Sequence, residues 1–122
     1  MYSERRNMKI PEIAEIIKAE ICTKNYDPTI EIYSACSADL MSDVMAFSKS
    51  NALLLTGLIN PQVIRTAEMM DIKAVIFARG KKPLESMIEM AEEKGIVLMA
   101  TDYPLFVASG KLYKNGIHGR GE

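Results

Sequence analysis

The chain has 122 residues, of which 48% are hydrophobic and 25% charged, and its formal net charge is −1. We expect a single domain over residues 1–122, large enough to bury a core without disulfides or a bound metal. The near-neutral charge disfavours binding to nucleic acid, and the absence of an apolar run of about 20 residues disfavours a membrane span.

The first third of the chain predicts one helix and two strands. Residues 1–8 are polar and of mixed charge, and we expect them to be loose. Pro11 predicts the start of a helix, because isoleucines recur behind it at helical spacing. A short strand is expected over residues 20–24, and a second strand over residues 30–38. Ser37 or Asp39 is the predicted cap of the helix that follows.

Two consecutive units come next, each an apolar run that ends in glycine and is followed by proline. The runs are residues 52–57 and 74–80, and the prolines are Pro61 and Pro83. This pattern is typical of a buried strand that turns into a helix, with proline at the first helical position. Spacing predicts that the two helices bury these residues: Val63, Ile64, Ala67 and Met70, then Leu84, Met87, Ile88 and Ala91.

A last strand is expected over residues 96–100. Thr101 and Asp102 are the predicted cap of a final helix that runs to about residue 115, and the glycine-rich residues 117–122 are expected to be loose. The alternation of strands and helices predicts an α/β fold. We expect about five strands in a mainly parallel sheet with helices on both faces.

In such a sheet, ligands bind where the parallel strands end. The candidate ligand-binding residues in these loops are Thr56, Gly57, Asn60, Arg79, Gly80, Lys81 and Thr101. Backbone amides at Thr56-Gly57 can face an anion, although a plain glycine turn is the alternative.

Arg79, Lys81 and Lys82 form the main basic cluster, which suits a phosphate. A solvated loop, or pairing of Arg79 with Asp39 or Asp102, is the alternative explanation.

No catalytic motif is recognisable. The residues around Gly80 lack the P-loop pattern, which disfavours a kinase or ATPase. The single histidine, His118, lies in the tail, which argues against a hydrolase with a Ser/His or Cys/His pair. Cys22 and Cys36 show no metal-ligand spacing and are interpreted as buried thiols of a reducing cytoplasm. We expect no metal and no cofactor.

One enzymatic hypothesis stays open. Asp39 and Asp43 lie one helical turn apart and could handle a phosphate together with Arg79, as in a small transferase. A cap and a solvated helix face explain the same two carboxylates.

Nine methionines are many for a core of this size. Met69 and Met90 fall beside the main apolar stripes of their predicted helices. Because methionine adapts to irregular surfaces, these side chains favour a homodimer or an assembly scaffold, although core packing explains each one singly.

The order of these motifs resembles the DRTGG domain over residues 32–108. The family has Thr-Gly-Asp-Arg after one strand and Thr-Gly-Gly after the next. Here the two segments read Thr56-Gly57-Leu58-Ile59 and Ala78-Arg79-Gly80. Thr56, Gly57 and Gly80 therefore match, while the family's Asp, Arg and one Thr-Gly pair are missing.

The resemblance implies a layered α/β domain that is commonly dimeric and has no established chemistry of its own. DRTGG modules occur in phosphotransacetylases and in CBS-containing pyrophosphatases, and the fold is similar to the N-terminal domain of HPr kinase. It implies a non-catalytic regulatory module that is homodimeric and responds to a partner enzyme or signalling protein, or to a small phosphorylated ligand or nucleotide.

Overall fold

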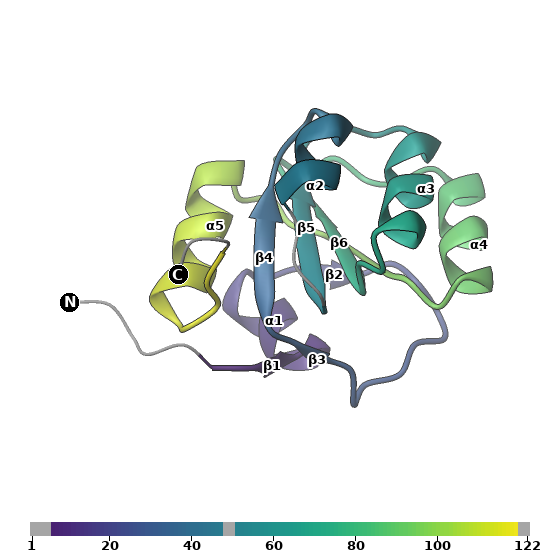
Figure 1. Ribbon diagram of the computed structural model, residues 1–122. Helices are drawn as coiled ribbons and strands as arrows, with labels where there is room; N and C mark the ends of the chain where they lie inside the picture. The colour runs from purple at the N-terminus through teal and green to yellow at the C-terminus, as the bar shows by residue number, and fades with distance from the viewer. Residues whose placement is uncertain (1–5, 48–50, 120–122) are drawn as a thin grey trace.

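The computed structural model of the protein describes residues 6–47 and 51–119 (Figure 1). Its main sheet has five strands in the spatial order β2-β7-β6-β5-β4. Strands β4 to β7 are parallel, and β2 joins β7 in antiparallel orientation. The prediction of a five-stranded, mainly parallel sheet is confirmed. The strands are β2 (Glu20–Ile21), β4 (Ser34–Ser37), β5 (Ala52–Thr56), β6 (Ala74–Phe77) and β7 (Val97–Ala100).

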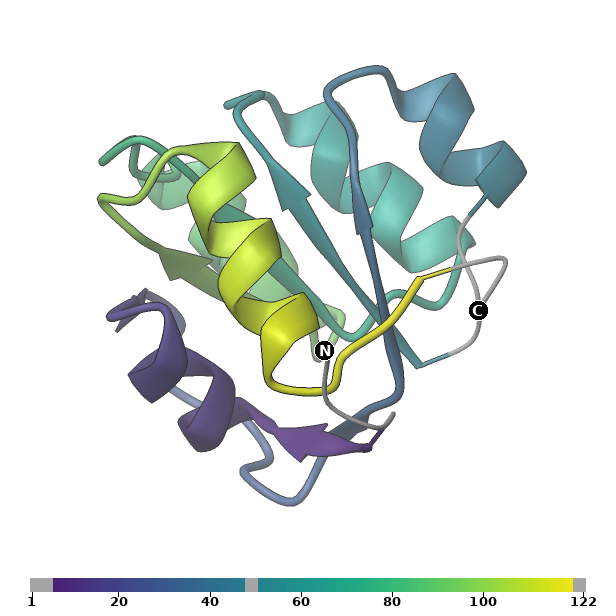
Figure 2. The same ribbon diagram turned by 90° about the vertical axis from the view of Figure 1, so that its left-hand side faces the viewer.

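Two helical layers cover this sheet. Helices α1 (Ile10–Ile16) and α5 (Leu105–Lys114) lie on the face that is turned toward the viewer in Figure 2. Helices α2 (Met41–Phe47), α3 (Pro61–Met69) and α4 (Glu85–Glu93) cover the other face. Every residue of β5, β6 and β7 is buried. The continuous apolar runs in the sequence therefore reflect strands that are covered on both sides.

Each face of the sheet has its own core. Leu53, Leu55 and Ile76 pack with α1 and α5, whereas Leu54 and Phe77 pack with α2, α3 and α4. Successive side chains of a strand point to opposite faces, so one apolar run supplies both cores.

The two prolines behave differently at the helix starts. Pro61 occupies the first turn of α3, as predicted. The prediction for Pro83 is wrong, because the chain is still extended at Leu84 and α4 begins at Glu85. Leu84 consequently lies outside the helix and is 54% exposed instead of buried.

The predicted cap of the last helix is also wrong. The residue that precedes α5 is Pro104, and no side chain caps this helix. The Thr101 hydroxyl instead donates to the Ile17 carbonyl oxygen at 2.6 Å and accepts from the Tyr103 amide at 3.2 Å. Thr101 thus joins the end of β7 to the end of α1.

Both ends of the described chain are packed. Met8 is buried in β1 (Met8–Lys9), which pairs with β3 (Glu31–Ile32) in a small antiparallel sheet. Ile117 and His118 are buried, and the Ala35 amide donates to the His118 carbonyl oxygen at 3.0 Å. The prediction of loose ends is therefore wrong at these positions, while residues 1–5 and 120–122 lie outside the described residues. The reason is long-range pairing that no local pattern reveals.

Cys22 and Cys36 are free thiols, and both are half-buried. Burial raises the pKa of both thiols, and the carboxylates of Glu20 and Asp43 raise it further at Cys22 and Cys36, respectively. A raised pKa in the folded state means that the neutral thiol is favoured there. This stabilisation is complete below the ordinary thiol pKa of about 8.5 and is lost as the pH rises through the higher folded value.

We therefore expect the free energy of unfolding to fall between pH 8 and pH 10.5. Urea denaturation at both pH values measures the change. The control is the Cys22→Ala, Cys36→Ala variant, which should lose less stability over the same interval. An equal loss in this variant would contradict the role of the thiols.

Candidate functional site

The candidate site lies where the parallel strands end and the loops to the helices begin. Asp39 is at its centre, because its Oδ1 accepts from the Thr56 hydroxyl at 3.0 Å and from the Gly57 amide at 2.7 Å. Thr56 Oγ1 in turn accepts from the Leu58 amide at 3.2 Å. Asp39 therefore contacts the end of β5 and does not form the predicted cap of α2. An anion at the Gly57 amide would have to displace this carboxylate.

The other predicted cap residue, Ser37, also has its contact elsewhere. Its hydroxyl lies 2.7 Å from the hydroxyl of Ser109 on α5. The pair links the end of β4 to the helix that covers it.

Two cations meet Asp39 in a small hollow. Arg79 and Lys81 are exposed, and together with Asp39, Gly57, Ala78 and Leu105 they line a space of about 80 Å³, which we call the basic hollow. Lys81 Nζ donates to the Gly57 carbonyl oxygen at 3.0 Å. The side chains of the hollow carry two positive charges and one negative charge, so the local charge favours an anion.

Backbone hydrogen bonds hold the loop that carries the cations. Arg79 adopts the left-handed conformation with a φ of 62°, and its amide donates to the Tyr103 carbonyl oxygen at 2.9 Å. The Gly80 amide donates to the Thr101 carbonyl oxygen at 2.9 Å. The loops after β6 and β7 are therefore fixed to each other, which fixes the position from which the Arg79 side chain extends.

The backbone conformation of Gly80 explains why glycine occupies this position. Its φ is +72°, and a Cβ atom at this position would lie 3.2 Å from Asp102 Oδ1. Only glycine adopts this conformation without strain. The glycine that matches the DRTGG motif at this position therefore has a structural reason. In the described part of the chain, the salt bridges do not include Arg79, so the expected pairing with Asp39 or Asp102 is not among them.

Two further hollows lie beside the basic hollow. One has a volume of about 240 Å³ and is lined by Lys18, Thr101, Asp102 and Tyr103. The other, of about 150 Å³, shares Lys18 and Asp102 and adds Gly80 and Lys82. The structure thus gathers six of the seven predicted residues at one edge, with Thr56 and Thr101 buried beneath it. Lys18 was missed because α1 meets the end of β7 only in the folded chain.

Asn60 has a different role. Its Oδ1 accepts from the Gln62 amide at 2.8 Å and caps α3, and it lines none of the hollows described above. Asparagine followed by proline is a local signal for a helix start, and the sequence already contained it.

We expect Asn60→Ala to lower the free energy of unfolding by about 1 kcal/mol, because the Gln62 amide loses its acceptor. Urea denaturation measures the change. The control is Asn60→Asp, which keeps an acceptor at the cap and should cost less than the alanine. An unchanged stability of Asn60→Ala would show that the cap is not important.

The transferase hypothesis finds only part of its residues together. Asp39 and Arg79 line the basic hollow, but Asp43 does not. Within residues 6–47 and 51–119, no three side chains of His, Cys, Asp or Glu are grouped to hold a metal ion. In the same residues, no helix is long and apolar enough to cross a membrane.

The fold of this chain matches that of a solved structure. The layered sheet with polar loops at the carboxyl ends of its strands defines the chain as an α/β domain of the open-sheet class. More particularly, its fold is DRTGG-like. It superposes with a TM-score of 0.73 on the crystal structure of the CBS and DRTGG domains of the regulatory region of Clostridium perfringens pyrophosphatase. That structure is a complex with an activator, diadenosine tetraphosphate.

The two chains are 15% identical, and the match covers 93% of this chain and 51% of the other. This protein thus corresponds to about half the length of the regulatory region. No family model and no curated protein matches the sequence. The resemblance to the DRTGG fold that the motifs indicate is confirmed by the structural match.

Proposed function

We propose that the protein is a non-catalytic regulatory module that binds a small phosphorylated ligand, such as a nucleotide, in the basic hollow. The observation that carries this proposal is that Arg79 and Lys81 line one hollow with the Gly57 backbone. Charged donors that converge on one space are how proteins hold phosphate oxygens. The solved structure of similar fold, a regulatory region in complex with a nucleotide activator, supports the same class of function.

A regulatory effect would pass through the loops. Lys81 already contacts the Gly57 carbonyl oxygen, and the Arg79 amide contacts the loop after β7. A phosphate held by Arg79 and Lys81 would link the loops after β5, β6 and β7, and a partner enzyme or signalling protein could recognise that state. The free thiols support a reducing, cytoplasmic setting for this regulation.

Native mass spectrometry of the freshly purified protein tests the proposal. An adduct of nucleotide size would support a sensor and give its ligand class. A protein without adduct that also fails to bind added inorganic phosphate would contradict a phosphate site. Turnover of phosphoester or acyl-phosphate substrates, lost in Asp39→Asn, would instead support the transferase.

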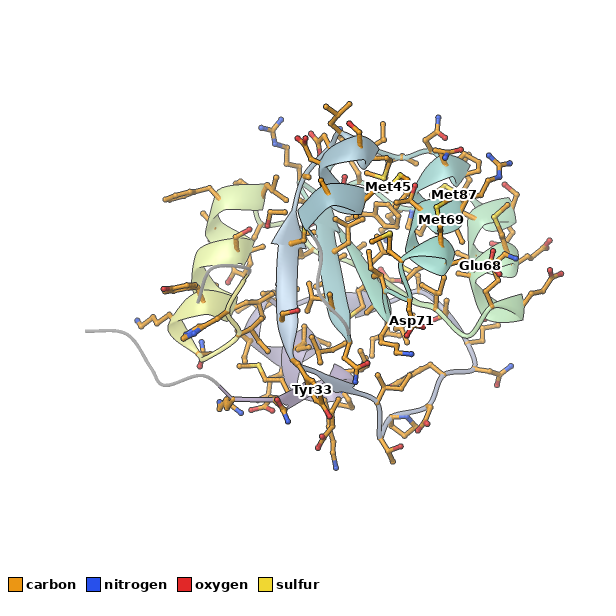
Figure 3. The ribbon with its side chains drawn as sticks, viewed as in Figure 1. Tyr33, Met45, Glu68, Met69, Asp71 and Met87 are labelled. Atoms are coloured by element: carbon orange, nitrogen blue, oxygen red, sulfur yellow. The ribbon has the colours of Figure 1, made fainter. Side chains whose placement is uncertain are left out.

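We also propose that the module is a homodimer. Met45 on α2 and Met69 on the neighbouring α3 are 46% and 62% exposed. Figure 3 shows both on the side of the molecule that carries α2, α3 and α4. Met90 is half-buried and packs against the core of this face, so it contributes less to the surface than its sequence position suggests. Exposed methionines favour a surface that accepts a partner.

The Met45→Lys, Met69→Lys variant is expected to weaken the dimer by about 30-fold, because two charges would enter a desolvated contact. Native mass spectrometry at several protein concentrations measures the dissociation. Phe106→Lys is the control, since Phe106 is also exposed but lies on α5, which covers the other face of the sheet. Circular dichroism should show an unchanged fold. An equally stable dimer in the double variant would place the contact on another surface.

A further inference from the structure

Another cavity lies beneath α5, next to the basic hollow. It has a volume of about 210 Å³, and we call it the α5 cavity. Its apolar wall includes Leu55, Leu112 and Ile117, and its polar groups include the Ser37 and Ser109 hydroxyls. His118 lines it as well, with its ring stacked on Tyr113 at a centroid distance of 4.8 Å.

The chain places the α5 cavity and the basic hollow side by side. Leu55 lines the cavity, and Gly57, two residues further on, lines the hollow. Ser37 and Asp39 repeat this relation at the end of β4. On α5 the relation runs the other way, because Leu105 lines the hollow and Ser109, one turn later, lines the cavity. Three separate segments therefore lead from one space to the other.

The two spaces differ in chemistry. The basic hollow contains the charged groups of Arg79, Lys81 and Asp39, whereas none of the described residues that line the α5 cavity is Lys, Arg, Asp or Glu. The hydrogen-bonded hydroxyls of Ser37 and Ser109 join the end of β4 to α5 on the path between them. One of the two hydroxyls accepts in this bond and keeps its own proton to donate.

We infer that the ligand is amphipathic, with a phosphate group in the basic hollow and a single aromatic ring or an aliphatic group of similar size in the α5 cavity. Apolar cavities of about 150 Å³ admit a benzene ring, so the volume beneath α5 is sufficient for one ring. The hydroxyl pair is placed to donate to the oxygen that links phosphate and ring. This inference rests on the proposed function and specifies the ligand class of that site.

Matched probes separate the two parts of the ligand. We would titrate the whole protein with phenyl phosphate, inorganic phosphate and phenol at constant pH and follow the titration by NMR. His118 is the single histidine, so its imidazole resonances report on the α5 cavity without ambiguity. We expect phenyl phosphate to bind at least about tenfold more tightly than inorganic phosphate, because the ring leaves water. Phenyl phosphate should shift the His118 resonances, and inorganic phosphate should not.

The variant Ser109→Met places a larger side chain at the wall of the α5 cavity. It should weaken the binding of phenyl phosphate by at least about tenfold and that of inorganic phosphate by much less, because only phenyl phosphate places a ring in the cavity. Ser86→Met is the matched control, since Ser86 is exposed on α4. If Ser109→Met fails to fold, the probe comparison in the unmodified protein still decides the question.

The outcomes are distinguishable. Equal affinities for phenyl phosphate and inorganic phosphate, with no shift at His118, would overturn the amphipathic ligand and leave the phosphate site intact. Phenol that binds as tightly as phenyl phosphate would also overturn it, because the two spaces would then act separately. Failure of both phosphates to bind would remove the proposed function itself.

Discussion

The Arg79→Ala, Lys81→Ala variant is expected to bind inorganic phosphate about 30-fold more weakly than the unmodified protein. Each side chain offers a charge-assisted hydrogen bond from the wall of the basic hollow. We assign about 1 kcal/mol to each contact, because both side chains are exposed and water screens their charges. Two such losses correspond to about a 30-fold change in the dissociation constant. NMR titration measures both constants.

A matched variant separates the local contacts from the overall charge. The double variant lowers the formal net charge from −1 to −3, since it removes two of the positive charges. Lys73→Ala, Lys94→Ala makes the same change at the start of β6 and the end of α4, away from the basic hollow. Its affinity for phosphate should stay within about twofold, because added salt screens distant charges. An equal loss in both variants would show that phosphate responds to net charge and not to a site.

The grouping of the basic hollow could be predicted from sequence because it needs only one rule. Gly57 and Arg79 both follow buried apolar runs, and the ends of parallel strands meet at one edge of a sheet. The same runs give the fold class, since strands buried on both faces require helices on both sides. These features could be predicted because each strand and the loop after it have a pattern within their own stretch of sequence.

The remaining features depend on contacts between distant segments. Lys18 joins the site through the packing of α1 against the end of β7, and His118 reaches the α5 cavity by pairing with the edge of β4. Neither position has a local pattern that distinguishes it from a surface residue. The role of Asp39 could not be predicted for another reason. An aspartate just before a helix can cap that helix or accept from the Gly57 amide, and the sequence is the same in both cases.

Phe77→Ala is expected to have the largest effect on stability, a loss of about 3–5 kcal/mol. Among the residues whose burial the structure describes, Phe77 is the largest fully buried side chain; it lies at the end of β6, where it packs in the core beneath α3 and α4. Its replacement removes apolar contacts and leaves a cavity that the surrounding close-packed side chains fill only in part. Urea denaturation followed by circular dichroism measures the free energy of unfolding.

The matched control is Phe106→Ala, because Phe106 is 88% exposed on α5. The same change in chemistry should alter stability there by less than about 0.5 kcal/mol. Since a loss of 3–5 kcal/mol is a large part of the stability of a small domain, Phe77→Leu serves as the milder variant, with an expected loss of about 1–2 kcal/mol. Similar losses at Phe77 and Phe106 would contradict the packing of β6 described above. A stable Phe77→Leu with reduced phosphate affinity would show that this core position also supports the loop that carries Arg79, which begins immediately after it at Ala78.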